Sequence, residues 1–243
     1  MKIEEDIKLD YNDVLIRPKR TVLSSRSEVN LERTIYFPIS KYTWTGVPII
    51  AANMDTIGTC EVHNILAKYK IITALHKFYT FEHYKNFFQQ GLLDPNYYMV
   101  STGITEKDKL KLFQILELLG HHCKFICIDV ANGYMERLVS FCREIRDKFP
   151  NKVIVAGNVV TREITEELIL QGKVDIVKVG IGPGSACLTR TQTGVGMPQL
   201  SAINECADAA HGVNGFIIGD GGITCPGDVS KGFGAGGDFI MIG

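Results

Sequence analysis

The chain has 243 residues, of which 45% are hydrophobic and 22% are charged, and its formal net charge is −1. This length suits one α/β domain with a large core, and the near-zero charge gives no indication of a nucleic-acid or acidic-membrane partner. No apolar run approaches the ~18 residues that a membrane-spanning helix needs. The first six residues are acidic and lack an apolar core, so we do not expect a signal peptide.

The first 45 residues are rich in charge, and we expect them to form an extension packed across the domain. After them, short apolar runs recur at fairly even spacing, and each has the length and composition of a buried strand. Eight such runs are predicted, at residues 47–51, 71–75, 97–101, 125–129, 153–156, 176–179, 216–219 and 239–242.

Helical periodicity fills the segments between these runs. One apolar stripe contains Leu110, Phe113, residues 115–116 and Leu119. A second contains Leu138, Phe141, Ile145 and Phe149, with arginines interleaved, among them Arg146. Alternation of strand and helix predicts parallel strands, and eight such units predict a (β/α)₈ TIM barrel as a single domain over residues 1–243.

The eighth predicted strand ends at the last residue, so the usual final helix of the barrel is absent from this sequence. We therefore expect either a truncated chain or a partner that replaces the helix. In both cases the outward sides of the first and last barrel strands should expose apolar surface.

Polar or glycine residues follow nearly every predicted strand. In a TIM barrel the loops at the carboxyl ends of the strands build the active site, so a row of such residues predicts one functional face. Each loop taken alone is also compatible with an ordinary turn. The residues are 53–55, 76–77, 101–103, 129–133, 157–158, 180–184 and 220–222.

One of the seven cysteines lies in such a loop. Cys187 follows an apolar strand and three glycines, and it precedes Thr189 and Arg190. Reactive thiols occupy polar, partly exposed and electropositive places, whereas structural thiols are buried and inert. The loop therefore predicts a nucleophilic cysteine.

The cysteine count is odd and no CxxC pair occurs, which favours reduced thiols in a cytoplasmic protein.

Seven motifs together resemble those of the IMP dehydrogenase/GMP reductase family, over residues 9–243. They are LDYNDVLIRP (residues 9–18), NMDTIGT (53–59), LHK (75–77), IDVANGY (128–134), AGNVVT (156–161), VGIGPGSACLTR (179–190) and GDGG (219–222). The run TRTQTGVG (189–196) resembles the reductase form of the family, and the chain has no room for the regulatory domains that many dehydrogenases insert. Leu188 stands where the family pattern leads us to expect threonine.

The resemblance implies NADPH-dependent reductive deamination of GMP to IMP and ammonia, through a covalent thioimidate on a cysteine. Such an enzyme belongs to purine nucleotide salvage. Two alternatives stay open: an IMP dehydrogenase without regulatory domains, and an inactive nucleotide-binding barrel fragment. The last arises because family members carry a mobile flap, a catalytic glutamate and part of the phosphate site after the eighth strand.

The resemblance also implies roles for particular residues. Cys187 would be the nucleophile, and Thr189 would assist proton transfer to the leaving ammonia. Asp220 would hold the ribose hydroxyls, because a carboxylate has two acceptor oxygens. Gly221, Gly222 and Gly243 would line the phosphate, whose oxygens accept backbone N–H bonds.

Cofactor and ion positions follow by the same resemblance. Cofactor-binding residues for NADPH would be Ser25, Arg26, Lys77, Asp129, Val130 and Ala131. The alternative for Arg26 is an ordinary solvated charge with no role in binding. Separately, no GxGxxG motif follows a predicted strand, which argues against a Rossmann domain as the cofactor site. Carbonyls of Gly182, Gly184, Cys187 and Arg190 would bind a monovalent cation, potassium. The family is usually a homotetramer, and we expect that here.

Overall fold

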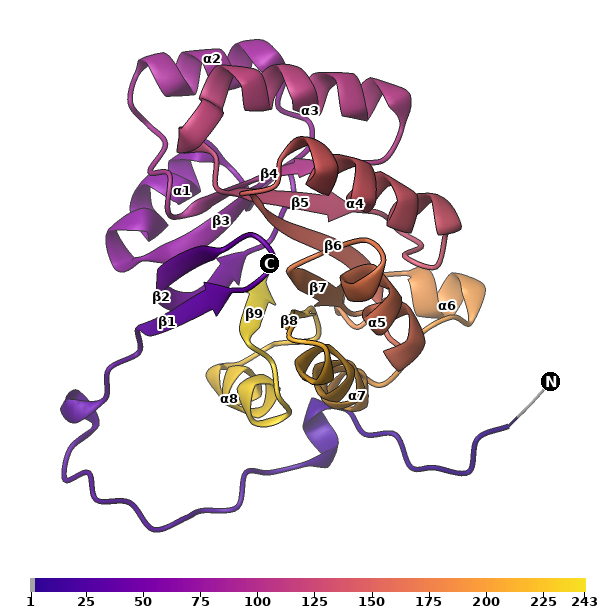
Figure 1. Cartoon of the computed structure of the whole chain (residues 1–243). Coiled ribbons are helices and arrows are strands. Elements are labelled where there is room, and N and C mark those ends of the chain that lie inside the picture. Colours follow the sequence, from indigo (N-terminus) through magenta and orange to yellow (C-terminus); the bar gives the residue numbers. More distant parts are fainter. Residues whose placement is uncertain (1–2) are drawn as a thin grey trace.

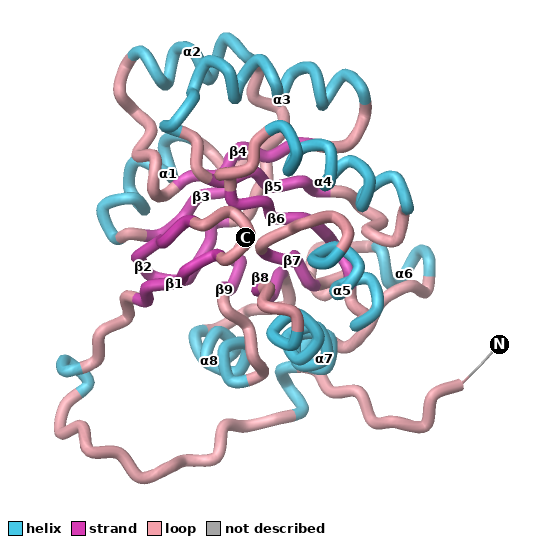
Figure 2. Tube along the Cα trace, in the orientation of Figure 1, coloured by secondary structure: helices cyan, strands magenta, loops and turns pink. Residues whose placement is uncertain are grey.

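The computed structural model describes residues 3–243 and shows a closed barrel of eight parallel strands surrounded by helices (Figures 1 and 2). Each strand pairs with the next along the chain, and β2 pairs with β9 to close the ring. The TIM-barrel prediction is therefore confirmed. The barrel strands are β2 (Tyr42–Ala51), β3 (Ile71–Leu75), β4 (Tyr98–Thr102), β5 (Phe125–Asp129), β6 (Val153–Val159), β7 (Ile176–Val179), β8 (Phe216–Asp220) and β9 (Phe239–Ile242).

Helices connect successive strands and cover the outside of the barrel (Figure 1). One connection, between β7 and β8, has two helices, the first of which is short. The helices are α1 (Cys60–Leu66), α2 (Phe81–Gln89), α3 (Glu106–Leu119), α4 (Glu136–Lys148), α5 (Arg162–Leu170), α6 (Thr189–Thr193), α7 (Gln199–Gly212) and α8 (Pro226–Gly234). The α3 helix begins with a capping box, in which Thr105 and Asp108 satisfy each other's backbone N–H groups.

The core has two layers because the side chains of a strand alternate between its two faces. The inner layer fills the barrel and includes Ile50, Met99, Val155 and Ile218. The outer layer lies between the strands and the helices, and Ile126, Ile154 and Ile217 contribute to it from the strands. With both faces of the parallel strands covered, the strands read as continuous apolar runs in the sequence.

Sequence periodicity was wrong at two helix positions. Leu110 is 63% exposed, and the buried stripe of α3 is Leu112, Ile115, Leu116 and Leu119. Leu110 is two residues before Leu112 and so lies about 200° away around the helix. In α4, Arg146 is buried, because its guanidinium finds a buried carboxylate and backbone carbonyls that no local pattern reveals.

A β-hairpin closes the amino-terminal end of the barrel. Strand β1 (Arg33–Phe37) pairs antiparallel with the first half of β2, which begins five residues before the strand that the sequence predicts. Phe37 and Trp44 from this hairpin are fully buried and pack on Phe125 and Phe239 at the base of the inner core. The hairpin therefore acts as a floor beneath the inner layer.

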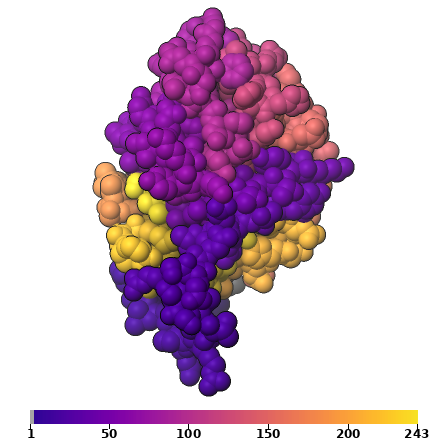
Figure 3. All heavy atoms as spheres, turned by 90° about the vertical axis from the view of Figure 1, so that its left-hand side faces the viewer, coloured from indigo at the N-terminus to yellow at the C-terminus, as the bar shows by residue number. Residues whose placement is uncertain are grey.

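The N-terminal segment before the hairpin has two parts. Leu9 and Tyr11 contact the barrel, since the Leu9 carbonyl accepts a bond from Ser201 and Tyr11 is buried. Residues 14–32 form an extended and mostly exposed segment, in which Leu15 is 90% and Val22 97% exposed. Figure 3 shows the indigo segment projecting below the α8 region. A hollow of about 590 Å³ lies between this segment and helices α7 and α8.

The outward sides of β9 and β2 meet without an intervening helix in residues 3–243. Ile49 and Ile242 on these sides are half-buried, and Ile65 on the neighbouring α1 is 58% exposed. Over the same residues, no helix combines the length and the apolarity that crossing a membrane requires.

Candidate active site

Buried polar atoms without partners gather near the carboxyl ends of the strands. Eight such atoms occur among the described residues, and four of them are His76 Nδ1, Ser101 Oγ, Asn158 Oδ1 and Gln199 Oε1, which lie at or beside these strand ends; the others are in Tyr11, Ser40, Thr73 and Tyr84. A buried polar atom left unpaired costs about 1–3 kcal/mol, so each one needs an explanation. A polar ligand in the mouth of the barrel would satisfy the four at the strand ends, and the functional face that the sequence predicts lies at this end.

The Cys187 loop follows β7 and is shaped by glycine and arginine. Gly182 has a φ of 67°, which favours glycine, and a Cβ there would lie 2.9 Å from the Arg190 side chain. Arg190 folds back across the loop, where its guanidinium donates to the carbonyls of Ile181 (3.2 Å) and Met197 (2.5 Å). The arginine therefore fixes the loop that presents the cysteine.

The thiol of Cys187 differs from the buried cysteines of the chain. Its Sγ is exposed and lies 3.3 Å from Thr189 Oγ1. Hydrogen bonds from the Thr189 hydroxyl and backbone N–H, with a smaller contribution from Arg190, lower the pKa of this thiol despite some burial. By contrast, burial raises the pKa of Cys60 to about 11 and that of Cys127 to about 12. Cys187 is thus chemically equipped as a nucleophile.

A cluster of charges crosses the barrel mouth, and sequence reasoning missed its central member. Lys178 Nζ lies 2.5 Å from Asp220 Oδ2 and 3.1 Å from Asp129 Oδ1. Asn158, which the sequence placed on the functional face without a role, donates from Nδ2 to Asp220 Oδ2 at 2.8 Å and to the Gly180 carbonyl at 2.8 Å. A lysine within an otherwise apolar barrel strand was the signal that could have revealed the cluster.

The charge of Lys178 favours the ionised form of Asp129. Burial alone would raise the pKa of Asp129, but the Lys178 ammonium and hydrogen bonds outweigh it, so the pKa is lowered. The pKa of Lys178 is raised, since the attraction of Asp220 and Asp129 exceeds the cost of its burial. The Asp129 carboxylate is therefore ionised at neutral pH and accepts hydrogen bonds.

The glycine turn after β8 packs on the cysteine loop. Gly221 and Gly222 have φ angles of 91° and 79°, which favour glycine, and a Cβ on either would meet Pro183. Tyr11 approaches the same turn, and its buried hydroxyl has no partner among the described residues. Gly243, also assigned to the phosphate side by the sequence, follows β9 and lies beside Met54.

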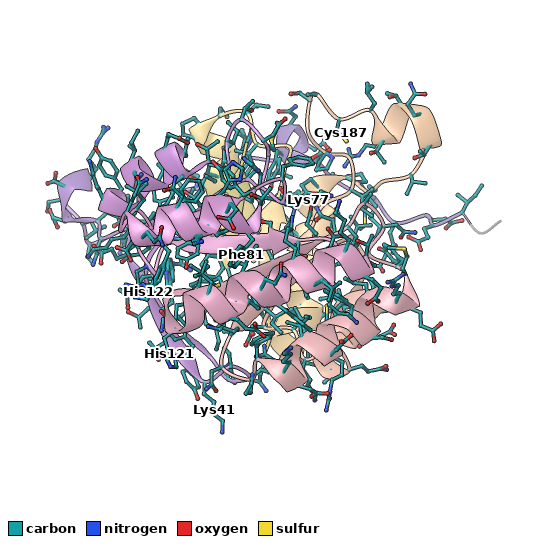
Figure 4. All side chains as sticks on the ribbon, turned by 90° about the horizontal axis from the view of Figure 1, so that it is seen from above. Lys41, Lys77, Phe81, His121, His122 and Cys187 are labelled. Atoms are coloured by element: carbon teal, nitrogen blue, oxygen red, sulfur yellow. The ribbon has the colours of Figure 1, made fainter. Side chains whose placement is uncertain are left out.

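The predicted cofactor residues fall into two groups. Asp129, Val130 and Ala131 lie at the end of β5, and the Val130 backbone exchanges hydrogen bonds with Gly157 and Asn158. Lys77 follows β3, is exposed, and its carbonyl accepts a bond from Lys111 at 2.5 Å. Figure 4 shows Lys77 and Cys187 toward the same end of the molecule, with Lys41 of the β1–β2 turn at the opposite end.

Ser25 and Arg26 lie elsewhere, on the exposed N-terminal segment. Ser25 caps a single turn of 3-10 helix, Arg26–Glu28, by bonding with Ser27 and Glu28. These contacts stay within the segment, which projects from the barrel in Figure 1. The structure therefore does not bring these two residues to the strand ends.

The four carbonyls predicted to bind potassium belong to the cysteine loop and the first turn of α6. The Gly184 carbonyl already accepts a bond from the Cys187 N–H at 3.0 Å, and the Arg190 carbonyl accepts one from Gly194 at 3.0 Å. Each carbonyl oxygen has a second lone pair, so these bonds leave room for an ion. Within residues 3–243, no group of three or more His, Cys, Asp or Glu side chains is arranged to hold a metal.

A family model described as IMP dehydrogenase / GMP reductase domain matches residues 8–243. Among curated proteins, a protein named GMP reductase from Buchnera aphidicola subsp. Acyrthosiphon pisum (strain Tuc7) is 60% identical over 244 residues, which cover this whole chain and 69% of that protein. A protein of the same name from Tolumonas auensis is 58% identical over 245 residues, covering the whole chain and 70% of that relative.

Among solved structures, a crystal structure of inosine 5′ monophosphate dehydrogenase from Legionella pneumophila superposes on this chain with a TM-score of 0.81. The two sequences are 32% identical, and the match covers 98% of this chain and 69% of that one.

Proposed function

The chain belongs to the IMP dehydrogenase / GMP reductase family, and on that premise we propose that it converts GMP to IMP and ammonia with NADPH as reductant. The family implies a purine nucleotide substrate and a nicotinamide cofactor. The choice of the reductase direction is supported by about 60% identity to proteins named GMP reductase, against 32% to the dehydrogenase structure.

The observation that carries the proposal is the Cys187 thiol, exposed and with a lowered pKa at the mouth of a barrel. In the proposed reaction its thiolate adds to C2 of the guanine ring. The amino group takes up a proton and leaves as ammonia, and the C2–S bond that remains is a thioimidate. An amino group on an aromatic ring is a poor leaving group, and covalent addition divides this difficult step into easier ones.

The bound reduced nicotinamide would supply the hydride that replaces sulfur at C2. In total, GMP, NADPH and one proton give IMP, ammonia and NADP⁺. Thr189 stands 3.3 Å from the sulfur, close enough to pass a proton toward the departing ammonia. Asp220 would accept bonds from the ribose hydroxyls, and the N–H groups of Gly221, Gly222 and Gly243 would bind the phosphate.

The residues at the strand ends fit a nicotinamide cofactor. Asp129 and the Val130–Ala131 backbone offer polar contacts beside the cysteine loop, and Lys77 offers an exposed cation for a phosphate group. We also propose potassium at the Gly182, Gly184, Cys187 and Arg190 carbonyls, a cytoplasmic location and a homotetramer. Ser25 and Arg26 remain proposed cofactor contacts.

The test is the loss of NADPH absorbance when GMP is added in potassium buffer. A GMP-dependent loss with formation of IMP supports the proposal. Reduction of NAD⁺ with IMP, and no reaction with GMP, would instead make the chain an IMP dehydrogenase. If neither pair reacts while GMP still binds, the chain is a nucleotide-binding barrel without turnover, and the proposed activity is wrong.

A further inference from the structure

Lys178 occupies a position where lysine is rarely found. It lies in the middle of β7, its side chain is 4% exposed, and it points into the barrel together with Ile176, two residues before it. A buried ammonium is costly unless it is paired and hydrogen-bonded. Here the ammonium contacts two carboxylates, those of Asp129 and Asp220, so its burial depends on both.

The two carboxylates come from strands that are not neighbours. Asp129 ends β5 and Asp220 ends β8, with β6 and β7 between them in the ring. Only a side chain that reaches across the barrel mouth can contact both, and Gly157 leaves the space for it. A Cβ on Gly157 would lie 2.7 Å from the Cβ of Lys178 and 2.3 Å from its carbonyl oxygen.

Both carboxylates remain partly open to the site above the lysine. The side chain of Asp129 is 27% exposed and that of Asp220 is 19% exposed. In the proposed function Asp129 serves the cofactor side and Asp220 the ribose side. Lys178 therefore lies beneath the proposed cofactor and ribose subsites, and it contacts Asp129 of the first and Asp220 of the second.

Few other polar or titratable groups face this cluster. Cys127, below it on β5, is a neutral thiol at physiological pH because burial raises its pKa to about 12. Asn158 and Asn53 donate hydrogen bonds to Asp220 and Asp129, and Lys77 acts on Asp129 from outside. Lys178 is thus the one buried cation shared by the two carboxylates in the described part of the chain.

We propose that Lys178 is a positioning residue that ties Asp220 to Asp129, so that the ribose side and the cofactor side of the site are held by one buried ammonium. This inference rests on the proposed function, which makes GMP the ligand. Without the ammonium, two carboxylates would face each other in a poorly solvated space. They would repel each other, and neither would be held in its place by the ammonium.

The test is the affinity for GMP, measured by calorimetry without cofactor between pH 6 and 8. Each variant is compared with the unmodified chain at the same pH, which cancels the titration of the GMP phosphate. Lys178→Gln should weaken binding about tenfold or more at pH 6, a change typical of lost charged hydrogen bonds.

Two further variants separate positioning from a structural role. Lys178→Arg keeps the charge and should bind GMP within about threefold of the parent, a small change on the scale of charged contacts. The double change Lys178→Gln with Asp129→Asn removes the repelling carboxylate, so it should recover most of the affinity. If Lys178→Gln alone fails to fold, these two variants still test the proposal.

The matched control is Lys152→Gln, a half-buried lysine at the other end of the barrel that bonds the carbonyls of Gly120 and Cys123. It should leave GMP affinity unchanged. The inference is overturned if Lys178→Gln binds GMP like the parent at every pH, or if the double variant recovers nothing. If the unmodified chain binds neither GMP nor IMP, the proposed function itself fails, whatever the variants do.

Discussion

Two buried ion pairs at opposite ends of the barrel have the same nitrogen–oxygen distance, 2.5 Å, but different surroundings. At the amino-terminal end, Arg146 also donates to the carbonyls of Pro150, Lys152 and Lys173, while Asp175 accepts from backbone N–H groups. Both oxygens of Asp175 and all three nitrogens of Arg146 are hydrogen-bonded, and the side chains are 7% and 0% exposed.

At the carboxyl-terminal end, the carboxylates that pair with Lys178 are partly exposed and still have acceptor positions free. Removing one partner of a closed pair leaves an uncompensated buried charge, whereas an open pair also offers acceptors to a ligand. The comparison indicates that the ion pair at the amino-terminal end serves the stability of the fold, whereas the one at the carboxyl-terminal end serves the proposed site. Changes at one end should therefore affect turnover and binding, and changes at the other should affect folding.

The largest effect is expected at the carboxyl-terminal end. Cys187→Ala should reduce GMP-dependent NADPH oxidation by on the order of 10⁴-fold or more, because no other group replaces the nucleophile. GMP affinity and the melting temperature should stay close to those of the parent, since the side chain is exposed. The control is Cys225→Ala, the other exposed cysteine, which should keep full activity. Retained turnover in Cys187→Ala would exclude the covalent mechanism.

The next largest effect is expected at the amino-terminal end. Arg146→Met leaves the Asp175 carboxylate buried without its cation and should lower the free energy of unfolding by about 3–5 kcal/mol. The GMP affinity of the folded fraction should not change. Chemical denaturation and calorimetry measure the two quantities.

A matched control for Arg146 exists on the same helix. Arg143 pairs with Asp147 on the exposed face of α4, at 3.1 Å, so Arg143→Met should cost less than about 0.5 kcal/mol. Equal losses from Arg143→Met and Arg146→Met would contradict the view that the closed pair stabilises the fold.

A smaller effect is expected for the open carboxylate itself. Asp220→Asn keeps the shape but loses the charge that would accept the ribose hydroxyls, so GMP binding should weaken about 10- to 100-fold. Calorimetric titration with GMP measures this change. The control is Asp208→Asn on the surface of α7, whose carboxylate pairs with the exposed Arg162 at 2.6 Å. An unchanged affinity in Asp220→Asn would show that the ribose lies elsewhere.

The smallest effect concerns the titration of the nucleophile. The lowered pKa of Cys187 means that its thiolate forms at a lower pH than that of an ordinary thiol, so alkylation by iodoacetamide should become fast at correspondingly lower pH. Thr189→Val removes the largest cause of the shift and should move the rate profile toward higher pH. Thr191→Val, whose hydroxyl bonds the Leu188 carbonyl instead, should leave the profile in place.

The sequence revealed the barrel because its strands are apolar on both faces and are separated by helical stripes. Even spacing of those runs carried the prediction of eight parallel strands, and only the ends of several strands differ by one to five residues. The β1–β2 hairpin was not predicted because Arg33–Gly46 directly follows the charged N-terminal stretch and was included in it, although the segment itself has only two charged residues. It becomes a strand pair only when Phe37 and Trp44 enter the barrel.

The candidate site was visible in part for a similar reason. Glycine-rich loops and polar residues that directly follow a strand can be recognised from the local sequence. Cys187 and Asp220 were found in this way. Lys178 and Asn158 contribute through partners 22 to 62 residues away along the chain, and such pairings require the three-dimensional register of β6, β7 and β8. Arg146 was grouped with the polar residues of its helix because its charged partner, Asp175, and the Lys173 carbonyl come from a distant part of the chain.

The floor made by the β1–β2 hairpin has one further consequence. Phe37 and Trp44 fill the amino-terminal end of the described barrel, which leaves the carboxyl-terminal end as the entrance. In the proposed reaction, nucleotide and cofactor must then share that entrance, and ammonia must leave through it while the purine is still attached to sulfur. The leaving group would therefore exit, and water would enter, through the same carboxyl-terminal opening that admits the nucleotide and the cofactor. Neither would pass through the barrel interior.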